Sequence, residues 1–428
     1  MNLNTTGDKD AAVGYSALVQ NTTGSCNVAM GDHAMNKNTT GHSNIAIGRQ
    51  ALACNTTAAY NTVVGACAMY CNTTAGMAAV AIGFRAMHNN TTGSCNTAVG
   101  FCSLHGITEG CFNTASGYRS ASGTTTGSYN VAHGANSLLS NTTGNSNIAV
   151  GYATMYSNTT GQLNTAIGDG ALYNNTTANL NVAVGRVALM ANTTGAANTA
   201  SGSYSLCKNT TGGCNTGLGY AALLSNTTGG CNTAVGSCAG CGNTTGAHNV
   251  FLGFNTGKVN TTGSCNVAVG DHALHLNTTA SNNTAVGRLA LYANTTGAFN
   301  VAVGTNSLDA NTTGLANTAS GYASLGGTTS GGYNAAFGYL AGTANTTANH
   351  NAFFGNFSGK SNTTGTMNVA VGSNALHTNT TGGCNTASGY KSLFANTTGS
   401  YSTAFGGKAL TANTTGNNQA FGLSLIHI

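Results

Sequence analysis

The chain has 428 residues, of which 12 are Lys or Arg and 7 are Asp or Glu, so its formal net charge is +5. Charged residues make up 4% of the sequence, whereas they make up about a quarter of an ordinary soluble domain. This composition argues against an enzyme with a charged surface. The apolar content of 41% argues against charge-driven disorder, and the sparse positive charge against a nucleic-acid footprint.

A repeat dominates the sequence. The tripeptide Asn-Thr-Thr recurs with a step of 17 residues from Asn4 to Asn413, and one extra residue enters between Asn72 and Asn90. Degenerate copies that keep the register begin at Ile107, Thr124 and Thr328. The array therefore has 25 repeat starts, of which the last is incomplete, and a fixed period of this kind is typical of a stacked repeat architecture.

Each position of the repeat, numbered as a column from 0 at the first Asn, has its own character. The consensus is N-T-T-G-x-x-N-(T/V)-A-(V/I/S)-G-x-x-(A/S)-(L/M)-x-x. Column 10 is Gly in all 24 full copies, column 6 is nearly always Asn and column 8 is mostly Ala. Nearly every charged residue falls in columns 11, 12, 15 or 16. We therefore expect one exposed, variable edge per repeat, with columns 8 and 9 as its less exposed strand.

The repeat predicts a strand and two corners. The segment N-T-A-V-G alternates with period two, as a short strand does, and N-T-T-G before it has the residues of a turn. Seventeen residues are too few for a helical repeat, which needs about 33 to 47. The sequence thus predicts an all-β solenoid of about 25 coils, in which stacked Asn side chains about 4.8 Å apart form amide ladders. We expect a local bulge in the copy between residues 72 and 90.

The invariant Gly of column 10 predicts a special backbone position. Column 3 accepts Ala and column 13 accepts Ser, whereas column 10 accepts neither. Such a column needs either a positive φ or a backbone contact too close for a Cβ atom. The structural turn glycines predicted in this way include Gly31, Gly48, Gly100, Gly151 and Gly168.

Two states of assembly remain open. About four positions in each 17-residue coil are reliably apolar and two of these are Ala-sized, so stacking has to supply much of the stability. The Ala and Gly columns would also let another chain approach closely. A homotrimer about a common axis and a monomeric solenoid both fit the pattern.

The two ends of the sequence suggest a fragment. Met1 falls in column 14, where Met35 and Met155 also stand, so it reads as an internal residue. The last six residues, 423–428, fit no column and match the conceptual translation of a common sequencing adapter. We therefore expect residues 1–422 to be a continuous array from a longer protein, followed by a non-native tail.

Candidate chemistry is sparse. Six of the 14 Cys lie in column 5, where small residues are tolerated, and Cys214 and Cys231 are neighbours there, close enough for a disulfide. Cys238 and Cys241 form a C-x-x-C without a second pair at zinc-finger spacing. The pair Asp271 and His272 lies in variable, solvated columns. We expect no catalytic, cofactor-binding or metal-binding residue and no cofactor.

Two surface features could contact other molecules. Twenty-two copies of Asn-Thr-Thr are glycosylation sequons, which also read as a structural turn ladder. Aromatic residues gather in columns 11 and 15, where exposed rings suit sugar stacking or receptor contact and also suit packing against neighbouring coils. The candidate surface-contact residues are Tyr15, Tyr118, Tyr152, Tyr220, Tyr322, Tyr339 and Tyr390.

The repeats resemble those of known fibres. The unit from Asn147 to Gly161, N-I-A-V-G-Y-A-T-M-Y-S-N-T-T-G, looks like repeats of long phage tail-fibre proteins and bacterial surface proteins. Many of those fibres end in a self-cleaving chaperone domain, which residues 1–422 do not contain. The A-V-G-x-x-A core also resembles the head repeats of trimeric autotransporter adhesins, which form trimeric β-rolls with usually shorter repeats.

The leading functional hypothesis is a non-catalytic fibre shaft or adhesive stalk outside the cell, on a phage tail fibre or a bacterial surface. Its partners would be further copies of the chain and a cell-surface glycan or receptor, bound by many weak contacts. Nucleic-acid binding and membrane insertion are not expected. The alternatives are an ice-binding β-solenoid and a glycosylated extracellular fibril. An ice-binding face usually needs Thr-x-Thr, whereas the adjacent Thr residues here point to opposite faces. A polysaccharide-cleaving β-helix is disfavoured, because seven acidic residues cannot easily form an acidic cluster.

Overall fold

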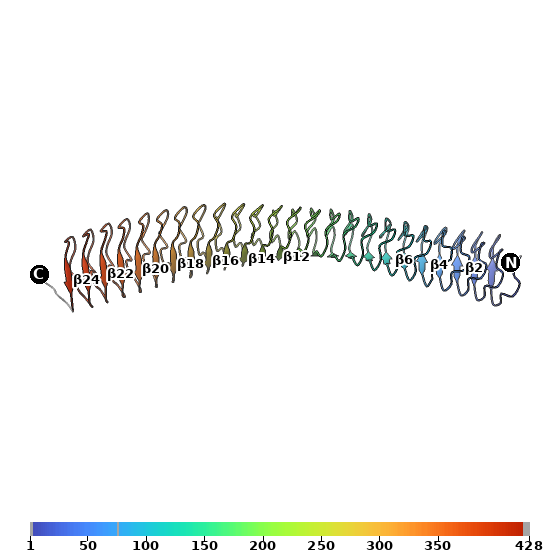
Figure 1. Cartoon of the computed structure of the whole chain (residues 1–428), viewed down its shortest axis with the longest axis horizontal. Coiled ribbons are helices and arrows are strands. Elements are labelled where there is room, and N and C mark those ends of the chain that lie inside the picture. Colours follow the sequence, from blue (N-terminus) through green and yellow to red (C-terminus); the bar gives the residue numbers. More distant parts are fainter. Residues whose placement is uncertain (1–2, 75–76, 423–428) are drawn as a thin grey trace. The chain divides into compact units, whose positions relative to one another are not determined.

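The computed structural model describes residues 3–74 and 77–422. The chain divides into two compact units, residues 1–214 and residues 215–428, and each consists of stacked coils with one short strand per coil (Figure 1). The predicted tail, residues 423–428, lies outside the described residues.

All strands have three residues. In the first unit they are β1 (Ala11–Val13), β2 (Val28–Met30), β3 (Ile45–Ile47), β4 (Thr62–Val64), β5 (Val80–Ile82), β6 (Thr97–Val99), β7 (Thr114–Ser116), β8 (Val131–His133), β9 (Ile148–Val150), β10 (Thr165–Ile167), β11 (Val182–Val184) and β12 (Thr199–Ser201). In the second unit they are β13 (Thr216–Leu218), β14 (Thr233–Val235), β15 (Val250–Leu252), β16 (Val267–Val269), β17 (Thr284–Val286), β18 (Val301–Val303), β19 (Thr318–Ser320), β20 (Ala335–Phe337), β21 (Ala352–Phe354), β22 (Val369–Val371), β23 (Thr386–Ser388), β24 (Thr403–Phe405) and β25 (Gln419–Phe421).

Within each unit, neighbouring strands pair in parallel with the register of the repeat. In the first unit Thr165 pairs with Val182, 17 residues later, and in the second unit Val267 pairs with Thr284. The predicted all-β solenoid with 17 residues per coil is thereby confirmed. The offset is 18 between β4 and β5, where the extra residue was found. The bulge expected there falls partly on residues 75–76, which lie outside the described residues.

The interior of a coil contains small apolar residues and asparagines. In the coil that starts at Asn158, the fully buried residues include Asn158, Asn164, Ala166, Ala171 and Leu172, from columns 0, 6, 8, 13 and 14. One Leu and two Ala side chains give little apolar burial, since a fully buried Leu contributes about 2 kcal/mol. Each coil therefore depends on the coils stacked against it for much of its stability.

The predicted amide ladders are present along column 0. Asn158 Nδ2 donates to Asn141 Oδ1 at 2.9 Å, and Asn175 Nδ2 in turn donates to Asn158 Oδ1 at 2.9 Å. The second proton of Asn158 Nδ2 is donated to Gly161 O at 3.1 Å, which closes the N-T-T-G turn. Each buried side chain thus links two coils and fixes its own corner.

Column 6 forms a second ladder. Asn164 Nδ2 donates to Asn147 Oδ1 at 3.1 Å in the preceding coil and to Ala178 O at 2.9 Å in the following coil. The backbone N–H of Asn164 donates to the same Asn147 Oδ1 at 3.1 Å. A buried polar group is tolerated only when it is paired in this way, and this pairing explains why asparagine is nearly constant in column 6.

The expected orientation of column 9 was wrong. Ala166 in column 8 is buried, whereas Ile167 in column 9 is 42% exposed, and Tyr152 in column 11 is exposed as expected. Side chains alternate along a strand, so an inward column 8 places columns 7 and 9 outside. The Ala residues of columns 8 and 13 and the Gly residues of column 3 are buried, whereas the Gly residues of column 10 are half-buried. The buried columns are therefore not free to contact a second chain, as the expectation of a close trimer required.

The corners combine glycine and left-handed residues. Gly168 has φ +131°, and a Cβ atom there would lie 2.6 Å from Gly185 O of the next coil, so both physical reasons predicted for column 10 hold. Gly31, Gly48, Gly100 and Gly151 have φ values of 138°, 129°, 137° and 135°. The A-L segment is a turn in which Leu172 has φ +51°. That conformation costs a non-glycine residue about 1–2 kcal/mol, which the burial of the Leu side chain offsets.

A size exchange occurs in the second unit. Phe251 stands in column 8 in place of Ala, and column 14 holds Gly in place of Leu both in the same coil, at Gly257, and in the preceding coil, at Gly240. A Cβ atom on Gly240 would lie 2.6 Å from Phe251 Cδ2. The aromatic ring therefore fills the volume that two Leu side chains occupy elsewhere, and Phe353 repeats the exchange between Gly342 and Gly359.

Candidate functional site

The column 11 tyrosines lie on the surface, on separate coils. All seven candidates are exposed, from 45% for Tyr339 to 75% for Tyr15. The structure brings Tyr322 and Tyr339 together, with ring centroids 5.4 Å apart and ring planes 17° from parallel. Tyr118 stacks on Phe101 with the same centroid distance. The row therefore offers both ring faces and ring edges to solvent, in short stacks rather than in one pocket.

Two further aromatic columns form stacks. Tyr156 and Tyr173 in column 15 lie 4.9 Å apart with planes 4° from parallel. Phe112 and Tyr129 in column 5 lie 5.2 Å apart, also at 4°. The sequence analysis noted column 15 but missed column 5. The sequence does contain a signal for this stack: two aromatic residues that are one repeat apart. Stacking of the coils places their rings face to face.

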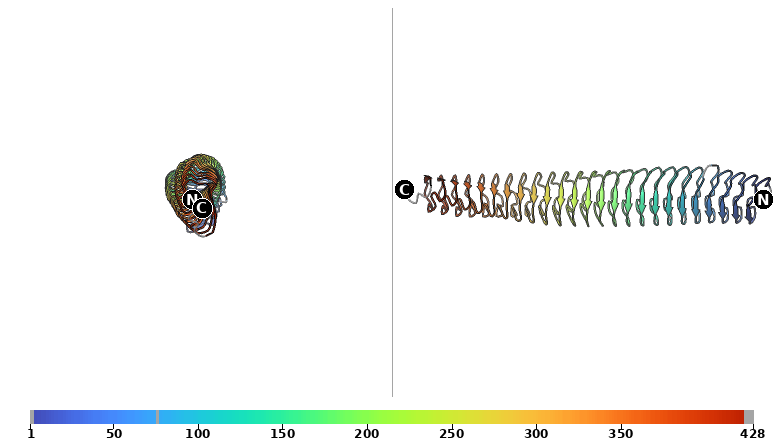
Figure 2. Two further views of the ribbon diagram at one scale, coloured as in Figure 1. Left: turned by 90° about the vertical axis from the view of Figure 1, so that its left-hand side faces the viewer. Right: turned by 90° about the horizontal axis from the view of Figure 1, so that it is seen from below.

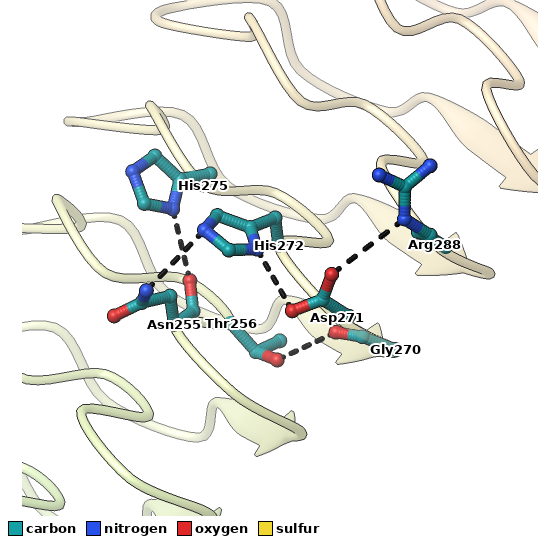
Figure 3. A network of polar contacts seen from close by, with 7 residues as sticks. All are labelled: Asn255, Thr256, Gly270, Asp271, His272, His275 and Arg288. Atoms are coloured by element: carbon teal, nitrogen blue, oxygen red, sulfur yellow. Dashed lines mark hydrogen bonds and ion pairs between the residues drawn. The ribbon is translucent and has the colours of Figure 1, made fainter.

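A network of polar side chains surrounds Asp271 and His272 in the second unit (Figure 3). His272 Nδ1 lies 2.8 Å from Asp271 Oδ1, and His272 Nε2 lies 3.3 Å from Asn255 Nδ2. Asp271 Oδ2 lies 3.7 Å from Arg288 Nε of the next coil. This pattern fits an imidazole that donates from Nδ1 to the carboxylate and accepts from the amide at Nε2.

The neighbouring imidazole of His275 stacks on Tyr292, with centroids 5.3 Å apart, and its Nδ1 lies 3.1 Å from Asn255 O. Burial lowers the pKa of His275, since a charged ring loses solvation there. In the described part of the chain, no group of three or more His, Cys, Asp or Glu side chains is placed to hold a metal ion. The network links adjacent coils and offers a polar surface patch.

The cysteines are free thiols, and all 14 lie within the described ranges. Cys214 and Cys231, the pair suggested for a disulfide, are both free. In the C-x-x-C segment the backbone N–H of Cys241 donates to Cys238 O at 3.4 Å, so the two residues span a turn. Burial raises the pKa of the Cys241 thiol, which keeps it protonated and weakens it as a nucleophile.

The acceptor nitrogens of the sequons point inward. Apart from the first and last copies, Asn4 and Asn413, the sequon asparagines are buried. In the coil that starts at Asn158, Asn158 Nδ2 donates its two protons to Asn141 Oδ1 and Gly161 O. A sugar attached to such a nitrogen would have to break the ladder, so folded coils do not present these sequons for modification.

A small depression is lined by Cys102, His105, Arg119 and Ser122 and has a volume of about 200 Å³. Burial lowers the pKa of His105, and its ring stacks on His88 with centroids 5.3 Å apart. Pockets for small ligands usually enclose about 300–1,000 Å³, so this depression suits a surface contact better than an enclosed ligand.

The residues described in the structure include no helix that is long and apolar enough to cross a bilayer. No protein-family model matches the chain, and a search of curated proteins found no similar protein.

Proposed function

We propose that residues 1–422 are part of a structural fibre shaft or adhesive stalk, exposed outside the cell on a phage tail fibre or a bacterial surface. This proposal rests on how the coils stack. Within each unit, neighbouring coils pair through their strands and through their buried asparagines. The buried asparagines of columns 0 and 6 bond to the coils above and below. These interactions extend the stack from coil to coil, and the role that we propose is structural and non-catalytic.

The exposed aromatic columns support a second element of the proposal, weak repetitive binding of a cell-surface glycan or receptor. Ring faces such as those of Tyr152 and Tyr220 are more than half exposed and suit stacking on a sugar. One such contact is weak, but many identical contacts on one fibre add up through multivalency. Further copies of the chain, including a homotrimer, belong to the same proposal.

Localisation tests the shaft proposal directly. Antibodies raised against the folded repeats should label fibres that project from virions or from unpermeabilised cells in electron micrographs. Labelling confined to the inside of permeabilised cells would refute the proposal. A glycan array tests the binding element separately, with Tyr322→Ala and Tyr339→Ala together expected to weaken any signal and Thr143→Ala, in column 2, as the matched control.

An exposed Thr row favours ice binding as the second candidate. In the N-T-T-G turn, Thr159 donates its hydroxyl to Thr176 O at 3.1 Å, whereas Thr160 is exposed, and column 2 repeats this exposure in successive coils. A single Thr row is narrower than the paired rows that order water well. Thermal hysteresis at micromolar protein concentration would support this candidate over the shaft.

A further inference from the structure

The outward side of the strands is an uncharged surface. We call the first and third residues of every strand the strand face, which is defined separately for β1–β12 and for β13–β25. None of these positions holds Lys, Arg, Asp or Glu, although the chain has 19 such residues elsewhere. Val, Ile, Thr, Leu, Phe and Ser fill nearly all of them. Charge is thus absent from the side of the coil where alternation points side chains to solvent.

The strand face is also contiguous. Ile148 and Ile167, from the adjacent strands β9 and β10, are 40% and 42% exposed. In the second unit Phe337 and Phe354 stack on this face with ring centroids 5.1 Å apart. Figure 2 shows the strands of successive coils following one another along one side of each unit. Thr and Ser interrupt the apolar residues of this face, for example at β7 and β12. Single exposed apolar residues are ordinary, but rows of them on adjacent strands between these interruptions indicate a contact surface.

The chemistry of the strand face restricts its partner. A charged partner would lose its hydration there and find no opposite charge, which costs several kcal/mol for each unpaired ion. The partner therefore has to present uncharged side chains, with the spacing of about 4.8 Å that separates neighbouring strands. A second copy of this chain meets both conditions with its own strand face, and two sheets pack face to face about 10 Å apart.

We propose that the strand face binds the strand face of a second copy of this chain. This inference deepens the proposed shaft, because it names the surface through which chains would associate. It also replaces the Ala columns and the Gly residues of column 3, which are buried, as the route by which chains approach one another.

The available area supports the pairing only if many coils take part. Twelve strands about 4.8 Å apart and about 10 Å long give β1–β12 a footprint of roughly 550 Å². Weak interfaces bury less than about 600 Å² on each partner and standard ones about 800 Å², so the face of β1–β12 alone supplies the area of a weak interface. Association should therefore be cooperative in the number of coils.

Light scattering on the full chain after size exclusion tests the proposal. The expected mass at micromolar concentration is at least twice the 42.3 kDa of one chain. Ile148→Lys combined with Val182→Lys places charges on β9 and β11, and should raise the dissociation constant at least about 100-fold. Thr143→Lys combined with Thr177→Lys places the same charges in the same coils, at exposed column 2, and should leave it unchanged.

A second measurement covers the case in which the lysine variant fails to fold. A benzophenone amino acid at Ile167 should give cross-linked dimers on illumination, whereas the same group at Thr160 should not. A monomeric native chain, equal effects of the two lysine pairs, or cross-linking from Thr160 alone would overturn the proposal. A monomeric chain that binds crystalline polysaccharide or ice through this face would likewise overturn it. Immunolabelling of the fibre is independent of all these outcomes, so the two proposals can fail separately.

Discussion

Replacing Gly168 by Ala should loosen one coil and its neighbour. Gly168 has φ +131°, a conformation that costs an L-residue about 1–3 kcal/mol. The added methyl would also lie 2.6 Å from Gly185 O and 2.7 Å from Gly185 C, which are backbone atoms that cannot rotate away. Gly185 N is itself bonded to Ile167 O at 2.8 Å, so relief of the clash strains the ladder. We expect the local free energy of unfolding to fall by at least about 1–3 kcal/mol.

Gly161→Ala is the matched control. A methyl there would meet Asn158 Oδ1 of its own coil and Ala178 O of the next, but φ at Gly161 is not left-handed, and Ala178 occupies the same column one coil later. A small backbone shift therefore accommodates it, and the cost should stay below about 1 kcal/mol. In Gly168→Ala, and not in Gly161→Ala, amide hydrogen exchange on the full chain should become faster around β10 and β11. The rate should rise about tenfold for each 1.4 kcal/mol of local stability that is lost. Equal acceleration in both variants would refute a special role for column 10.

Three further predictions use the second unit. Phe251→Ala should lower the free energy of unfolding by about 3–5 kcal/mol in chemical denaturation. Gly257→Leu should destabilise the native chain but should restore part of the lost stability when it is added to Phe251→Ala. Equal destabilisation by Gly257→Leu with and without Phe251→Ala would contradict the size exchange. Thr328→Asn should stabilise the chain by about 1 kcal/mol, because Asn311 Oδ1 is buried without a donor; an unchanged unfolding midpoint would show that the ladder contributes nothing there. Burial raises the pKa of Asp309 above its ordinary 3.8, so the stability of its coil is full below that pH and falls as pH rises through the folded pKa. Asp309→Asn should therefore stabilise the chain at pH 7 and have no effect near pH 3, and a gain of the same size at both would argue against this titration.

The periodic features of the sequence predicted the periodic features of the fold. Column 10 glycines, the amide ladders and the short strand follow from residue types that recur every 17 positions, and the column 0 ladder is interrupted only where Ile107, Thr124 and Thr328 replace its Asn. The orientation of column 9 was missed because its apolar character suggested burial. Alternation from the inward Ala of column 8 fixes the opposite orientation.

Departures from the consensus were harder to interpret. The exchange of Phe251 with Gly240 and Gly257 involves two neighbouring coils, and only the stacked structure shows that these columns share one volume. The positive φ of Leu172 has no signal in residue type, because leucine rarely adopts it. Among the candidate surface residues, column 11 was found by counting within columns. The stacks of column 5 were missed because that column varies too much to enter a consensus.

The offset of 18 residues between β4 and β5 has a consequence for how such a chain changes over generations. Despite the extra residue, Asn90 Nδ2 still donates to Asn72 Oδ1 at 3.1 Å. The extra residue is thus accommodated within one coil, and the coils that follow keep the register of the repeat. Because each coil also presents nearly the same upper and lower surfaces, unequal recombination that adds or removes whole repeats creates no new packing problem. Length can then vary between descendants as a trait of its own, largely independent of the stability of any coil.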